Sequence, residues 1–99
     1  MSRLARIINV EPLGGLQLRL TFSDGLVREL DLGPMIEGGV FESLRNPAEF
    51  ARVAVDEVAG TVVWPAGIDL DPDVLHGDHP PASGAPPVVL REYTLRQTG

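Results

Sequence analysis

The sequence predicts a small α+β domain in which a small antiparallel sheet, built from two hairpin or meander units, is backed by one or two short helices. Apolar and polar residues alternate over residues 16–22, a period of two that is typical of a half-buried β-strand. Asn46 and Asp71 are capping residues followed directly by proline, which is a common start for a helix. Turn residues separate these segments. The predicted order of elements is β-β-β-α-β-β-α.

The loop between the second and third predicted strands sets their register. A two-residue loop would place acidic residues opposite the leucines of the apolar face. A three-residue loop with Gly25 in the left-handed conformation instead pairs Leu18 with Leu30. It also places Arg19 opposite Glu29 on the solvent face, a cross-strand pair worth about 0.2–1 kcal/mol. We therefore predict the three-residue loop.

The remaining elements are predicted from local patterns. A first strand is expected at residues 6–10, and apolar residues at helical spacing indicate helix within residues 40–44. Residues 52–56 and 61–64 are predicted to form a second hairpin. The register of the first hairpin brings Arg28 onto the apolar face, where we expect its stem to follow the surface and its head to reach water.

Several short motifs carry a resemblance to a known family. They are T-F-S-D-G at 21–25, D-L-G-P at 31–34, V-F-E-S-L at 40–44, N-P-A-E-F at 46–50 and V-V-W-P-A-G-I-D-L-D-P-D-V-L at 62–75. The pattern resembles a family of small bacterial proteins catalogued as domain of unknown function 2442, and W-P-x-G-x-D-L-x-P-D-x-L is its most specific part. The resemblance implies a small α+β domain with no established activity. Some relatives resemble the antitoxin-like half of a two-protein module, and others carry an added DNA-binding helix-turn-helix, which we do not expect within these 99 residues.

The chain is predicted to have three parts. Residues 1–76 form a single α+β domain. Residues 77–87 are rich in proline and glycine and are predicted to be an extended linker. Residues 88–99 are a C-terminal docking or dimerisation segment, apolar enough to form a strand or a short helix. The pattern leaves open whether this segment docks on its own chain or on another.

Composition excludes several functional classes. The sequence has no cysteine, which excludes disulfides and thiolate chemistry, and no lysine, which excludes Schiff-base catalysis. Its net charge of −6 disfavours direct binding of nucleic acid, whose recognition needs clustered cations. No apolar run approaches the length of a membrane span, and no signal peptide is recognised, so we expect a cytoplasmic protein. No cofactor is predicted.

The acids after the tryptophan resemble the start of a calcium loop. Asp69, Asp71 and Asp73 recur at every second residue, but the EF-hand pattern requires glycine at the sixth position and glutamate at the twelfth. Val74 and Pro80 occupy those positions. We therefore predict that Asp71 caps a helix and that Asp73 interacts with its dipole. Asp69 is less well explained by this role.

Metal binding and catalysis have only weak candidates. Asp69, His76, Asp78 and His79 are residue types that ligate divalent metals, but a loop followed by two prolines preorganises them poorly, so no metal site is predicted. No serine lies in a G-x-S-x-G motif, and no catalytic residue is predicted. The chain is therefore not expected to be an enzyme. The alternative is a small metal- or carboxylate-dependent enzyme or binder that uses the Asp69–Asp73 and His76 cluster.

The expected function is therefore a non-enzymatic protein-interaction domain. The candidate anchors in its C-terminal segment are Val89, Leu90, Tyr93 and Leu95, which would add a strand to a partner's sheet or enter a groove. Trp64 has two interpretations, as a plug of the core or as an exposed partner anchor. The partner is expected to be another protein or a second copy of the chain. The family resemblance implies an antitoxin-like or adaptor role toward a small companion protein.

Overall fold

The computed structural model describes residues 5–36, 39–77 and 85–95, and it confirms the predicted fold class. The main sheet is antiparallel, with four strands in the order β1-β2-β3-β6, and a separate two-stranded sheet is formed by β4 and β5. The strands are β1 (Ile7–Gly14), β2 (Gln17–Phe22), β3 (Leu26–Asp31), β4 (Ala54–Asp56), β5 (Thr61–Val63) and β6 (Val88–Thr94). The helices are a 3₁₀ segment (Gly39–Arg45), α1 (Pro47–Phe50) and α2 (Pro72–His76).

The register predicted for the first hairpin is confirmed. Leu18 pairs with Leu30, and Arg19 pairs with Glu29. Gly25 has a φ of 93°, in the left-handed region that the three-residue loop requires. Alternation along this hairpin places its leucines on one face of the sheet and the Arg19 pair on the other.

Strand β1 is longer than the sequence predicts. It continues through Pro12 to Gly14, with a shift in register between these two residues. Because β1 lies at the edge of the main sheet, the missing N–H of a proline is tolerated in it. At its start, the Ile7 N–H donates to the Gly60 carbonyl at 2.9 Å, and the Arg6 guanidinium donates to the carbonyl of Glu57. These bonds tie the β4–β5 turn to the main sheet.

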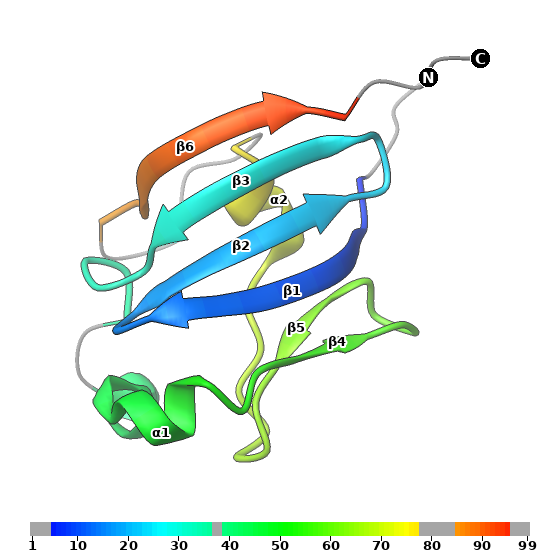
Figure 1. The fold of residues 1–99 in the computed structure, drawn as a ribbon. Helices are drawn as coiled ribbons and strands as arrows, with labels where there is room; N and C mark the ends of the chain where they lie inside the picture. Colours follow the sequence, from blue (N-terminus) through cyan, green and yellow to red (C-terminus); the bar gives the residue numbers. More distant parts are fainter. Residues whose placement is uncertain (1–4, 37–38, 78–84, 96–99) are drawn as a thin grey trace.

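The hydrophobic core lies between one face of the main sheet and the segments that cover it. Its fully buried side chains include Leu18, Leu20, Phe22 and Leu30 from the sheet, and Leu44, Phe50, Val62, Trp64 and Leu75 from the covering segments. Figure 1 shows α2 behind the sheet, while no helix of the described residues lies over the face toward the viewer. We call this second face the open face.

Trp64 occupies the core rather than the surface. Its side chain is 1% exposed, its indole N–H donates to the Phe50 carbonyl at 2.9 Å, and its ring lies 5.6 Å from the Phe50 ring. The interpretation of Trp64 as an exposed partner anchor is therefore corrected. A small domain needs large apolar side chains to fill its core, and Trp64 fills it at the end of the second hairpin.

Candidate functional site

The most accessible structured element of the described chain is β6, which forms the second edge of the main sheet. It pairs with β3 from Leu26↔Thr94 to Asp31↔Val88, with an irregularity between Glu29 and Leu30. Within the described residues no strand pairs with its outer edge (Figure 1). In this single chain the C-terminal segment thus docks on its own domain, and docking on another chain stays a prediction.

The structure brings the predicted C-terminal anchors together on this edge. Val89, Leu90, Tyr93 and Leu95 are each between 37% and 51% exposed, and Val88 joins them. An exposed, apolar edge strand presents unpaired N–H and C=O groups and is a template for pairing with another chain. These exposed side chains lie along the edge strand but on both faces of the sheet, since Val89 pairs with Leu30 and Tyr93 pairs with Val27.

A row of alternating charges crosses the open face from β6 to β1. Arg91 Nη1 lies 3.8 Å from Glu29 Oε2, Arg19 Nε lies 3.0 Å from the same oxygen, and Arg19 Nη1 lies 2.7 Å from Glu11 Oε1. The hydrogen bond to Glu29, with the further help of Glu11, outweighs burial and raises the pKa of Arg19 above its ordinary value. We call these four residues the charge row.

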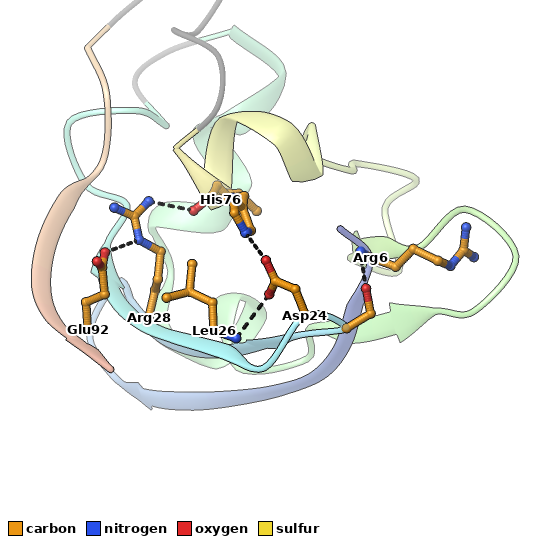
Figure 2. A network of polar contacts seen from close by, with 8 residues as sticks. Arg6, Asp24, Leu26, Arg28, His76 and Glu92 are labelled. Atoms are coloured by element: carbon orange, nitrogen blue, oxygen red, sulfur yellow. Dashed lines mark hydrogen bonds and ion pairs between the residues drawn. The ribbon is translucent and has the colours of Figure 1, made fainter. Parts of the chain in front are cut away.

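Arg28 links β6 to α2 on the covered side of the sheet. Its Nε lies 2.7 Å from Glu92 Oε1, and its Nη1 donates to the Leu75 carbonyl at 3.0 Å (Figure 2). The side chain is 15% exposed, so the expectation that its head reaches water is wrong. The head is held instead by the Leu75 carbonyl, because the last carbonyls of a helix such as α2 have no intrahelical partner and can accept from a side chain.

The predicted helix start at Asp71 is confirmed. Its side chain accepts from the Asp73 N–H at 2.9 Å, Pro72 is the first helical residue, and Gly77 ends α2 in the left-handed conformation. Two of the three clustered acids therefore lie at the beginning of a helix, as expected. The third, Asp69, is exposed.

Asp69 lies apart from the helix cap, at a shallow groove. The groove has a volume of about 450 Å³ and is lined by Phe41, Ser43, Ala66, Gly67, Ile68 and Asp69. Its walls mix apolar and polar groups. The Asp69 backbone forms an isolated bridge to Val63, which fixes the loop after β5.

His76 turns toward the loop of the first hairpin. Its Nε2 lies 2.8 Å from Asp24 Oδ2 (Figure 2). Its ring also meets the Phe22 ring edge to face, with the ring centroids 4.8 Å apart. Burial by itself would raise the pKa of Asp24, but the Leu26 N–H and His76 outweigh it and hold that pKa below its ordinary value. His76 therefore helps to fasten α2 to the sheet.

The metal candidates are not assembled in the described part of the chain. Among residues 5–36, 39–77 and 85–95 no group of three or more His, Cys, Asp or Glu side chains is arranged to hold an ion. Asp78 and His79 lie outside these residues. Sequence reasoning missed Glu92 and Arg28 as partners, because their contact joins two strands that are far apart in the chain.

The comparisons with known proteins identify the family. A family model described as protein of unknown function (DUF2442) matches residues 7–78. The chain belongs to this family. No curated protein and no solved structure matched in the same comparisons. The matched span contains β1 to α2 and ends before β6. None of the helices in the described residues has the length and apolar composition to cross a membrane.

Proposed function

We propose that this protein is a non-enzymatic protein-interaction domain whose β6 edge accepts a strand from a partner. The observation that carries the proposal is an exposed, apolar strand whose outer edge is unpaired within the described chain. The resemblance of some family members to antitoxins favours an antitoxin-like or adaptor role toward a small companion protein. Binding by strand addition uses main-chain hydrogen bonds for affinity and alternate side chains for specificity.

The backbone of β6 has suitable groups for such an addition. The Leu95 N–H donates to the Gly25 carbonyl at 2.7 Å, so the backbone N–H of Leu95 points toward β3 and not toward the outer edge. Because hydrogen-bonded and non-hydrogen-bonded pairs alternate in antiparallel sheets, Tyr93 also faces β3, whereas the N–H and C=O groups of Glu92 and Thr94 point outward. Each backbone hydrogen bond formed there contributes about 0.5–1.5 kcal/mol net.

Binding is preferred over catalysis because two residues of the candidate cluster, Asp71 and His76, already have structural contacts. Asp71 caps α2, and His76 is bound to Asp24. Asp69 lies at its groove, and within the described residues it belongs to no group of three or more His, Cys, Asp or Glu side chains that could hold an ion. The charge of −6 supports a protein partner rather than a nucleic acid.

The proposal is tested by blocking the outer edge of β6 without disturbing its inner edge. Thr94→Pro removes an outward-facing N–H, which an edge strand tolerates, and Thr94→Ala is the matched control that keeps it. We expect the proteins bound by the wild-type domain in cell extracts, or its self-association in sedimentation experiments, to be lost in the proline variant and kept in the alanine variant. Equal behaviour of all three chains contradicts the proposal.

A further inference from the structure

We infer that the strand received at β6 is antiparallel, belongs to a different protein, and carries a basic residue followed by an acidic residue opposite Glu92 and Arg91. This inference rests on the proposed function and specifies the chemistry of the partner. The two faces of β6 carry charges of opposite sign at the outer edge of the described sheet, Arg91 on one face and Glu92 on the other.

On the open face, the charge row ends at Arg91. This arginine is 65% exposed and lies 3.8 Å from Glu29, whose same carboxylate oxygen is already bound by Arg19 at 3.0 Å. Arg91 therefore shares an acid that has a closer partner. The next position in the alternating row lies on the incoming strand, directly opposite Arg91, and an acidic residue there continues the pattern.

On the covered side of the sheet, the last charged residue before the outer edge is an acid, Glu92, rather than a base. Glu92 is 45% exposed and binds Arg28, whose guanidinium also donates to the Leu75 carbonyl. The position opposite Glu92 on an incoming strand is therefore suited to a basic residue. Directly opposed side chains lie about 4.5–5.5 Å apart at Cβ, so both charges are within reach of their partners.

The direction of the incoming strand fixes the order of its two charged residues. Every pair of neighbouring strands in this sheet is antiparallel. An antiparallel addition to β6 runs from the Thr94 end toward Val88, so its residue opposite Glu92 precedes its residue opposite Arg91. The required order is basic and then acidic, with β-branched or apolar residues on either side.

A second copy of the chain does not supply this arrangement. In an antiparallel pair, directly opposed side chains lie on the same face of the sheet. Arg91 is on the open face and Glu92 is on the covered side, so Arg91 of one copy never lies opposite Glu92 of the other. Registers centred on either residue oppose like charges, which is destabilising, and the charge of −6 on each copy adds long-range repulsion. The charges favour a different protein.

The test uses two synthetic peptides of identical composition. Each has ten residues, with Lys-Glu at the centre of one peptide and Glu-Lys at the centre of the other, and four residues of alternating valine and threonine on either side. Binding to the full chain is measured by fluorescence anisotropy. We expect the Lys-Glu peptide to bind about 10-fold more tightly, since two favourable cross-strand pairs replace two unfavourable ones. Arg91→Gln should reduce this preference to about three-fold, because one of the two pairs is neutral in that variant.

Three results of the peptide titrations overturn the inference, and one result of sedimentation does so as well. The three titration results are equal affinity for the two peptides, a preference for Glu-Lys, and binding of neither peptide. Displacement of a self-associated form by either peptide, seen in sedimentation, also overturns it, because the occupant is then a second copy. The proposed function fails separately, when Thr94→Pro leaves the captured proteins and the self-association of the chain unchanged. Circular dichroism of the Arg91→Gln variant verifies that its fold is intact.

Discussion

Replacing Arg28 by methionine tests how strongly α2 and β6 are joined. Methionine keeps the apolar stem but removes the guanidinium, which bonds the Leu75 carbonyl at 3.0 Å and Glu92 at 2.7 Å. A hydrogen bond from a charged group contributes about 1.5–3 kcal/mol, and a half-exposed ion pair adds about 0.5 kcal/mol. After an allowance for the packing of methionine, we expect the free energy of unfolding to fall by about 2 kcal/mol.

The assay for Arg28→Met is urea denaturation followed by Trp64 fluorescence, a suitable probe because the ring is buried in the core. A loss of 2 kcal/mol corresponds to about 8–16 °C in the melting temperature of a domain of this size. Arg52→Met is the matched control, because Arg52 is 63% exposed and lies 3.7 Å from Glu49, so its loss should cost less than about 0.5 kcal/mol. Equal effects of the two substitutions would refute the assigned role of Arg28.

Three further predictions concern α2 and the loop it contacts. Asp71→Ala should lower the free energy of unfolding by about 1 kcal/mol through loss of the helix cap. Asp69→Ala should change it by less than about 0.5 kcal/mol in the same denaturation assay. A larger loss in Asp69→Ala than in Asp71→Ala would contradict the role of Asp71 as the cap. Gly77→Ala should lower the free energy of unfolding by more than about 1 kcal/mol, because φ is 100° at this residue and a Cβ would lie 2.8 Å from the Arg28 guanidinium. Thermal melting measures the effect, and an unchanged melting temperature would contradict the predicted strain. Because the pKa of Asp24 is lowered in the fold, its carboxylate stabilises the protein above pH of about 4, and this contribution is lost as the pH falls through the lowered pKa. Melting temperatures between pH 6 and 2 should therefore fall less steeply in Asp24→Asn than in the wild type, and parallel curves would show that the carboxylate contributes nothing.

The parts of the fold that the sequence predicts correctly are those governed by local chemistry. The loop at Gly25 fixes its own register because only one loop length keeps the leucines on one face. The caps at Asn46 and Asp71 are recognisable because a short polar side chain followed by proline satisfies the first turn of a helix.

The parts that the sequence does not predict depend on contacts between distant segments. The partner of β6 is β3, more than 50 residues earlier in the chain, and no local pattern specifies that pairing. For the same reason the sequence places the Arg28 head in water and predicts only one pair of the charge row, Arg19 with Glu29. The extension of β1 through Pro12 depends on β1 lying at an edge, which is a property of the whole sheet.

The position of β6 relative to the family match has a consequence for how such a domain could change its target. The span shared with the family ends at residue 78, and every side chain of β6 beyond it is exposed. Apart from Arg91 and Glu92, which pair with charged residues of β3, substitutions along this strand disturb few contacts of the scaffold and should cost little stability. If β6 is the recognition edge, as we propose, its sequence can diverge while the scaffold is retained, and the same separation makes β6 a suitable position at which to graft new specificities.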